Sequence, residues 1–446
     1  MDRRDFLRQS GVGLGAAGLR LPRPAPRPVP TAAQLAWQRS ELALFLHFGV
    51  NTFTGREWGD GREDPALFNP AAFDARQWAR VAKAAGFKAL ILTAKHHDGF
   101  CLWPTDTTLH SVRRSPWRSG TGDVVHETAI SCQLEGLGFG VYLSPWDRNA
   151  PSYGDWRRYN DFYRQQLTEL LTRYGPLAEV WFDGATGEGP DGRRQEYDWP
   201  AVHALVRRLQ PRALMFSDAG PDIRWVGNER GVAGDPNWCT VNPDAVPYPG
   251  AVGPAVEAML QHGDPDGTVW RPAEADVSIR PGWFWRAEED AGVKNPRELL
   301  DLYASSVGRN ANLLLNVPPT RDGLLGPADV RALTGFGDLR RRWFEEDLAA
   351  GIAWRRDSPT LFTGDLPRAV RCDTILLREE IERGQMVSAH RVEMLVDGAW
   401  TTVADSTTIG RSRLHRVEPV TAAAVRITVE ALGQPSLLPA RIYLSP

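Results

Sequence analysis

Cysteine is scarce in this sequence, and the few cysteines are widely separated. The 446 residues include four, Cys101, Cys132, Cys239 and Cys372, and no two of them form a Cys-x-x-Cys pair. This spacing excludes a zinc ribbon and a dense disulfide framework. We therefore expect four free thiols.

The sequence also lacks an excess of charge of either sign and a long apolar run. With 52 basic and 55 acidic residues the formal net charge is -3, so no overall basic field exists to gather phosphate groups. Nucleic acid is therefore not an expected partner, and a small or uncharged substrate is favoured. No stretch approaches the roughly 20 apolar residues that cross a bilayer, so we expect no membrane span.

The first 30 residues are treated separately from the fold. Arg3-Arg4-Asp5-Phe6-Leu7-Arg8 precedes the weakly apolar GVGLGAAGL, which is the layout of a twin-arginine export signal. The Pro-rich RLPRPAPRPVP that follows is typical of a stiff, extended linker. We expect residues 1–30 to be a signal and linker, and the protein to be exported to the periplasm or the extracellular space. The alternative is an untranslocated leader.

From residue 41 onward, short apolar runs alternate with amphipathic helical stretches. The runs typical of strands are ELALFLHFG, FKALILTA, LGFGVYLS, LAEVWFD, RALMFS and ANLLLNV. The clearest helices are residues 74–86, with Asp74 as N-cap and Gly86 as terminator, and residues 157–175. Repeated strand and helix units over about 300 residues predict a (β/α)8-like TIM barrel over residues 31–345.

A doubly wound nucleotide-binding sheet is the structural alternative. It is disfavoured because no GxGxxG or GxxxxGK[ST] motif follows the first strand. Residues 350–446 change to short alternating runs separated by turns such as Asp397-Gly398, which predicts an antiparallel β-sandwich. We expect this sandwich to brace the barrel, with Trp400 and Arg413 as possible contact residues, although a carbohydrate-binding module is the alternative.

Polar residues at the carboxyl ends of barrel strands line the active site of such a fold. The first strand ends with Phe45 and His47, the second with Lys95-His96-His97-Asp98-Gly99, the third with Tyr142, and the fourth with Trp181-Phe182-Asp183-Gly184. Asp183 stands out because it follows an apolar strand and precedes a glycine that permits close approach of a ligand. An Asp that merely caps the next loop is the alternative.

His96 and His97 have three interpretations. Neighbouring residues of a strand point to opposite faces, so both serve one ligand only if the strand has ended before them. A buried core histidine beside a surface one is the second interpretation. A metal pair is the third, but barrel metal sites usually use His-x-His, and His47 stands alone, so no metal is expected.

Hydrolysis of a glycoside needs a second carboxylic acid. The candidates are Glu57 in REWGDG, Glu229 in GNERG, and Glu274 with Asp276 in WRPAEADVSIRPGWFW. The last segment surrounds its two acids with tryptophan and phenylalanine, and such desolvation raises a carboxyl pKa towards that of a general acid. The alternative is a structural loop that plugs the barrel mouth through an Arg–Glu ion pair.

The chain resembles the retaining α-L-fucosidases of glycoside hydrolase family 29. The resemblance runs through LALFLHFGVNTFTGREWGDG, LTAKHHDGFCLWPT, GVYLSPWDRN, EVWFDGA and NLLLNVPP, and continues into the sandwich. It implies that Asp183 is the nucleophile. It also implies a set of fucose-binding residues: Phe45, His47, Glu57, Trp58, His96, His97, Tyr142 and Trp181.

The acid–base residue differs between branches of this family. PAEADVSIRPGWFW is similar to the branch that acts on α-1,3- and α-1,4-linked fucose, which implies Glu274 as acid–base and adds Arg280 and Trp285 as further sugar contacts. The resemblance thus implies a retaining exo-α-L-fucosidase that needs no cofactor and takes a fucosylated oligosaccharide or glycoconjugate as substrate. The alternatives are a metal-dependent barrel hydrolase and an inactive fucose-binding protein.

Overall fold

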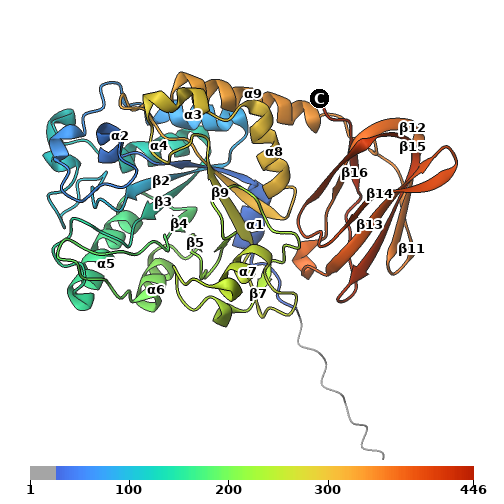
Figure 1. Cartoon of the computed structure of the whole chain (residues 1–446), viewed down its shortest axis with the longest axis horizontal. Helices are drawn as coiled ribbons and strands as arrows, with labels where there is room; N and C mark the ends of the chain where they lie inside the picture. Colours follow the sequence, from blue (N-terminus) through green and yellow to red (C-terminus); the bar gives the residue numbers. More distant parts are fainter. Residues whose placement is uncertain (1–26) are drawn as a thin grey trace, which may run out of the picture.

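A parallel eight-stranded sheet forms the larger part of the molecule (Figure 1). The structure is a computed structural model and describes residues 27–446, so the predicted export signal lies outside the described residues, apart from its last few positions. The sheet order is β5-β4-β3-β2-β1-β10-β9-β6. Its strands are β1 (Leu42–Leu46), β2 (Ala89–Lys95), β3 (Gly138–Leu143), β4 (Glu179–Trp181), β5 (Leu214–Phe216), β6 (Arg224–Trp225), β9 (Ala273–Ser278) and β10 (Ala311–Asn316).

The two edges of this sheet approach each other and close a barrel. Phe216 at the end of β5 forms a parallel bridge with Ile223, directly before β6, and the Ile223 amide donates to the Met215 carbonyl at 3.1 Å. The predicted (β/α)8-like barrel is therefore confirmed. It departs from a regular repeat at one point, because a short loop without a helix connects β5 to β6.

Helices cover the outside of the barrel (Figure 1). Asp74 caps α3 through the amides of Arg76 and Gln77, and Gly86 ends it at φ 97°, as the sequence predicts. A short α1 lies at the amino end of the strands, where Trp37 donates to Glu179 at 3.0 Å. The helices are α1 (Ala32–Ser40), α2 (Val50–Thr54), α3 (Ala75–Ala85), α4 (Val124–Glu135), α5 (Trp156–Arg173), α6 (Trp199–Leu209), α7 (Pro254–His262), α8 (Pro296–Ser306) and α9 (Pro327–Trp343).

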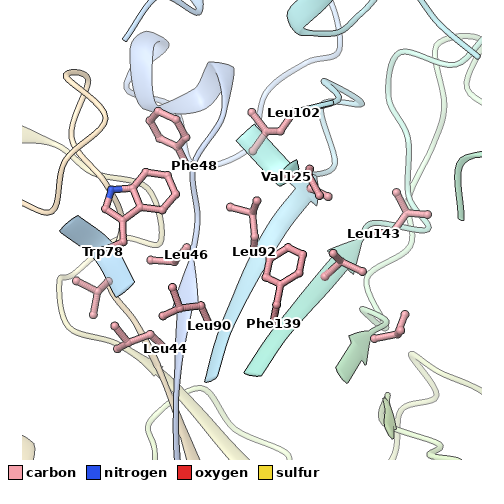
Figure 2. Close-up of a cluster of buried hydrophobic side chains, with 14 of the residues drawn as sticks. Leu44, Leu46, Phe48, Trp78, Leu90, Leu92, Leu102, Val125, Phe139 and Leu143 are labelled. Atoms are coloured by element: carbon pink, nitrogen blue, oxygen red, sulfur yellow. The ribbon is translucent and has the colours of Figure 1, made fainter. Parts of the chain in front are cut away.

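Alternation along the strands separates an outer core from the barrel interior. Figure 2 shows Leu44 and Leu46 of β1 and Leu90 and Leu92 of β2 in the outer core with Trp78 of α3. The intervening Phe45 belongs to a separate interior cluster with Tyr142 and Trp181, among others. Parallel strands buried on both faces explain why the sequence shows these strands as continuous apolar runs.

The carboxyl-terminal sheet folds over a core of its own. Its strands are β11 (Trp354–Ser358), β12 (Leu361–Leu377), β13 (Val387–Val396), β14 (Ala399–Ser406), β15 (Arg413–Ala431) and β16 (Arg441–Tyr443). Register shifts interrupt the pairing of the long strands β12 and β15, and such irregularities bend strands. One end of β12 pairs with β11 and the other with β16, and both halves contribute to one apolar cluster. The predicted antiparallel sandwich is confirmed.

The sandwich lies beside α8 and the carboxyl end of α9 (Figure 1). Trp343 at the end of α9 donates to Thr374 at 3.0 Å, and Arg413 forms an ion pair with Asp235 of the barrel at 2.6 Å. Trp400 instead packs within the sandwich, below the Arg426 guanidinium. A two-stranded ribbon of β7 (Thr240–Val241) and β8 (Val269–Trp270) completes the described fold.

All four cysteines are buried and free, as the sequence predicts. In residues 27–446 no helix is both long and apolar enough to cross a membrane. The same part of the chain contains no group of three or more His, Cys, Asp or Glu side chains placed to hold a metal ion.

Candidate active site

A cavity of about 330 Å³ opens at the carboxyl ends of the barrel strands. Residues at the ends of β1, β2, β3 and β4, or directly after them, meet there, which is where this fold places its active site. Eight predicted site residues line it with Asp183, namely Phe45, His47, Glu57, Trp58, His96, His97, Tyr142 and Trp181. The remaining wall includes Asp218, Trp225, Glu229, Gly250, Ala251, Val252, Asp276 and Trp283.

Asp183 follows β4 and lines the cavity. Its Oδ1 accepts the Ala185 amide at 2.7 Å. Its Oδ2 accepts the Tyr142 hydroxyl at 2.8 Å. The side chain keeps 26% of its surface exposed. Two hydrogen bonds therefore fix the orientation of an accessible carboxylate, the arrangement that an attacking group needs.

His47 is held as a neutral hydrogen-bond acceptor. The Asn316 amide nitrogen donates to Ser278 and to the Trp283 carbonyl, each at 2.9 Å. Its Oδ1 is thus left to accept from His47 Nδ1 at 2.9 Å. The other nitrogen, Nε2, then carries the lone pair. Burial lowers the pKa of His47 to about 3, so the ring is uncharged near neutral pH.

The hydrogen bonds of Ser144 fix the tautomer of His97 in the same way. Ser144 donates its hydroxyl proton to the Trp146 carbonyl at 2.6 Å, so it accepts from His97 Nδ1 at 2.7 Å. His97 Nε2 then faces Asp183 Oδ2 at 3.8 Å, beyond hydrogen-bond length. Burial lowers the pKa of His97 and lowers that of His96 well below its usual value. Both rings line the cavity because β2 ends at Lys95, before either histidine.

Glu57 and Trp283 meet at one side of the cavity. Glu57 Oε1 accepts the Trp283 amide at 2.5 Å, and its Oε2 accepts from Arg286 at 2.7 Å. Burial raises the pKa of Glu57, although the hydrogen bond from the Trp283 amide and the positive charge of Arg286 lower it. Trp58 stays 57% exposed and so presents an apolar face at the rim.

Glu229 is the acidic residue at the mouth of the cavity. It lies in the loop after β6, where Trp283 Nε1 donates to its Oε2 at 3.3 Å. The residue is exposed, yet partial desolvation raises the pKa of Glu229, and the nearby charges of Asp183 and Glu57 raise it further. A solvent-facing carboxyl whose pKa is raised keeps its proton to higher pH than an ordinary glutamate, which suits it to give that proton to a group at the cavity mouth.

Two further carboxyl groups line the cavity. Asp276 of β9 accepts from Trp225 Nε1 at 2.7 Å, and burial raises its pKa well above the usual value. Asp218 accepts the Gly250 amide at 2.9 Å, and burial raises its pKa to about 6. The raised pKa of Asp276 means that this carboxyl keeps its proton to higher pH than an ordinary aspartate.

The structure places Glu274 outside the cavity, contrary to the role that the resemblance implies. It lies within β9, is 1% exposed, and accepts the Trp181 indole proton at 3.0 Å. Burial raises its pKa well above the usual value, and burial raises the pKa of the neighbouring Glu179 to about 7. A carboxyl enclosed beneath Trp181 cannot reach a leaving group, so its place does not suit a proton donor.

Arg280 and Trp285 also lie away from the cavity wall. Arg280 is 1% exposed and binds Asp329 at 2.7 Å and Asp290 at 2.8 Å. Trp285 lies 6.0 Å from the Arg280 guanidinium, and its ring nitrogen is buried without a partner among the described residues. The Arg280 ion pairs therefore brace the loop that delivers Trp283, which lines the cavity, whereas Arg280 and Trp285 do not line it.

Comparison with known proteins identifies the family. The α-L-fucosidase family model matches residues 62–344. The chain belongs to the α-L-fucosidase family. This α-L-fucosidase family member is 42% identical to α-L-fucosidase 1 of Arabidopsis thaliana over 434 residues, which cover 90% of this chain and 84% of the relative.

Solved structures of the family superpose over nearly the whole fucosidase fold. The crystal structure of SpGH29 has a TM-score of 0.89 and 40% identity, with 94% of this chain and 99% of that chain covered. A Ruminococcus gnavus GH29 fucosidase in complex with fucose has a TM-score of 0.84 and 32% identity, with 95% and 97% covered. The recognised family is therefore confirmed.

Several cavity residues of this fucosidase family member escape the sequence pattern. Asp218 and Trp225 flank the short β5–β6 connection, and Ala251 and Val252 come from a loop without strand periodicity. Asp276, in contrast, is a candidate carboxylate of the sequence beside Glu274, and the structure places it in the cavity wall. No strand is predicted there from the sequence, because acidic residues are uncommon in strands.

Proposed function

We propose that this protein is an exo-α-L-fucosidase that removes terminal α-L-fucose from glycans with net retention. One observation carries the proposal: the oriented Asp183 carboxylate opens into the same cavity as Glu229, among neutral imidazoles and aromatic rings. Retaining glycosidases use such a pair of carboxyl groups, one as nucleophile and the other as acid and then base. We assign these roles to Asp183 and Glu229.

In the first step, an Asp183 oxygen attacks the anomeric carbon of fucose. The bond from that carbon to the glycosidic oxygen breaks, and Glu229 gives its proton to the departing oxygen. The products are a fucosyl ester on Asp183 and the free aglycone alcohol. The raised pKa of Glu229 keeps the required proton on this residue at higher pH than for an ordinary glutamate.

In the second step, the Glu229 carboxylate takes a proton from water. The water oxygen attacks the anomeric carbon, the ester bond breaks, and Asp183 leaves as a carboxylate. Two displacements at one carbon restore the original configuration. The sum is one glycoside and one water converted to fucose and an alcohol, with both carboxyl groups returned to their starting states.

The neutral histidines suit a hydroxylated, uncharged sugar. The tautomers of His47 and His97 leave Nε2 as an acceptor, so each ring can accept a hydrogen bond from a sugar hydroxyl. A sugar epimer whose hydroxyl points elsewhere leaves that buried acceptor without a partner, which weakens its binding. Uncharged rings also add no repulsion to the positive charge that develops on the sugar in the transition state. Full activity after exhaustive chelation would distinguish this mechanism from a metal-dependent hydrolase.

We further propose α-1,3- or α-1,4-linked fucose in branched glycans as the substrate class. The exposed Trp58 and the 88% exposed Val252 extend the apolar rim beyond the cavity, which offers surface to the sugars that flank fucose. We expect kcat/KM for a branched α-1,3/4-fucosylated trisaccharide to exceed that for an aryl α-L-fucoside by about 10-fold or more, as remote binding energy is used in the transition state. Equal or reversed rates contradict this linkage assignment.

Export is proposed on the sequence of the amino terminus alone. Arg3 and Arg4 precede a short apolar stretch, as in signals of the twin-arginine route. We expect residues 1–30 to direct a folded reporter across a bacterial inner membrane, and Arg3→Lys combined with Arg4→Lys to stop that transport. Equal export of both fusions contradicts the proposal.

A further inference from the structure

A second cavity, of about 270 Å³, lies between the barrel and the sandwich and gathers positive charge. Arg340 enters it from α9, and Arg378, Arg411 and Arg441 enter it from the sandwich. It has no lining residue in common with the cavity that holds Asp183. The charge it collects is therefore separate from the proposed fucosidase chemistry.

A single carboxylate faces these four guanidinium groups among the described residues that line the cavity. Glu41 Oε1 accepts from Arg411 at 3.2 Å, and its Oε2 accepts the Tyr303 hydroxyl at 2.9 Å. Arg340 approaches the same carboxylate only to 3.9 Å, and Arg441 is 3.9 Å from Asp347 outside the cavity. One negative charge in the cavity thus faces four positive charges.

Arg378 shows the imbalance most directly. Its guanidinium makes no hydrogen bond or ion pair to any other side chain in residues 27–446, and its Nε is buried without a partner, as is that of Arg340. Burial lowers the pKa of Arg378, and repulsion from Arg441 and Arg411 lowers it further. Arg378 is half-buried, and an enclosed Nε–H without a hydrogen-bond partner costs free energy because it has lost its contact with water. These donors are satisfied if an anion occupies the space.

We propose that this cavity binds a small oxyanion of the phosphate, sulfate or carboxylate type. Guanidinium groups present paired N–H donors in a geometry that matches the oxygens of such anions. The anion would join α9 to the sandwich, because its ligands come from both domains. It could be free in solution, or it could be the acidic group of a sugar carried on a glycan.

The test is calorimetric titration of the full-length protein with inorganic phosphate and sulfate, at ionic strength matched with chloride. We expect saturable binding of one anion per chain. Arg378→Gln removes a charged donor and is expected to weaken binding about 10-fold or more. Arg331→Gln, an exposed arginine on the same helix as Arg340, is the matched control and is expected to leave binding unchanged.

A second arm of the experiment identifies the source of the anion. Glucuronate and galactose 6-sulfate are titrated beside phosphate: tighter binding of either acidic sugar indicates a glycan-borne group, and tighter binding of phosphate indicates a free ion. If Arg378→Gln does not fold, Arg441→Gln replaces it, because this side chain is 48% exposed. Absence of saturable binding to all four anions, or equal binding by wild type and variant, overturns the proposal. Since no turnover is measured, the result does not depend on the fucosidase assignment.

Discussion

Replacement of Asp183 by glycine is expected to lower kcat for an aryl α-L-fucoside by at least about 1,000-fold, because removal of a covalent nucleophile leaves only binding and electrostatic effects. Initial rates of release of the aryl alcohol measure this loss. Asp191→Asn is the control, because Asp191 forms its ion pair with Arg193 on the surface and does not line the cavity. Retention of more than a tenth of the wild-type rate by Asp183→Gly contradicts the assignment.

The same variant separates an enzyme from a fucose-binding protein without turnover. We expect Asp183→Gly to keep binding fucose, since the ring of histidines and aromatic residues remains in place. Azide fits the space that the carboxylate leaves and attacks the anomeric carbon from the same face. The expected product is β-L-fucosyl azide, formed with inversion in a single displacement. A wild-type protein that binds fucose but shows no turnover would favour the binding-protein alternative.

Replacement of Glu229 by glutamine is expected to have the second largest effect. Loss of general acid catalysis is expected to lower kcat/KM for a glycan by about 100- to 10,000-fold, because the alcohol of a glycan leaves poorly without a proton. The rate of the first step should fall much less for an aryl fucoside, because its acidic leaving group departs without a proton. Azide should then intercept the fucosyl ester on Asp183 and give α-L-fucosyl azide, the opposite anomer to that from Asp183→Gly. Equal losses for both substrates, or no azide product, would contradict the role of Glu229.

The pH profile offers an independent readout of Glu229. A general acid must be protonated in the free enzyme, so kcat/KM falls as pH rises through its pKa. Partial desolvation raises the pKa of Glu229, which moves this fall to higher pH than for an ordinary glutamate. Glutamine cannot ionise, so the alkaline fall is expected to disappear from the residual activity of Glu229→Gln.

Glu274→Gln is the matched control, and it tests the role that the resemblance implies. The new amide oxygen can still accept from Trp181 Nε1, and its NH2 group can donate to Glu179, so we expect kcat/KM within about 10-fold of wild type. Glu274→Leu leaves the indole donor unpaired at a cost of about 1–3 kcal/mol. A loss with Glu274→Gln as large as with Glu229→Gln, and confined to poor leaving groups, would restore Glu274 as the acid.

Local patterns predict the parts of the site that strands deliver in order. The helix over residues 74–86 and the strands that contain Tyr142 or end just before His47 and Asp183 follow from apolar periodicity and caps, which act over a few residues. β9 was missed because its alternate residues, Glu274 and Asp276, face the barrel interior, so their acidity masks the strand pattern. The burial that makes them unusual comes from strands far away in the sequence.

The choice between the acids could not be made along the chain. The sequence leaves Glu57, Glu229, and Glu274 with Asp276 as candidates, and the family resemblance implies Glu274. In the fold, Glu274 and Asp276 occupy successive inward positions of one strand, the first beneath Trp181 and the second in the cavity wall. Glu229 reaches the mouth of the cavity because it lies in the loop after β6. The sequence does not reveal this position, since β6 has only two residues and therefore almost no periodic pattern.

The sequence by itself determined the family, the barrel with its sandwich, the place of Asp183 and most of the residues that line the cavity, because these depend on short-range periodicity and on motifs. The tertiary structure alone decided which carboxyl group meets solvent at the cavity mouth and which tautomers the histidines hold. It also brought four arginines of two domains to one cavity. Depth within a closed barrel, hydrogen-bond partners and charge balance are set by segments distant in the chain, and they therefore appear only once the chain has folded.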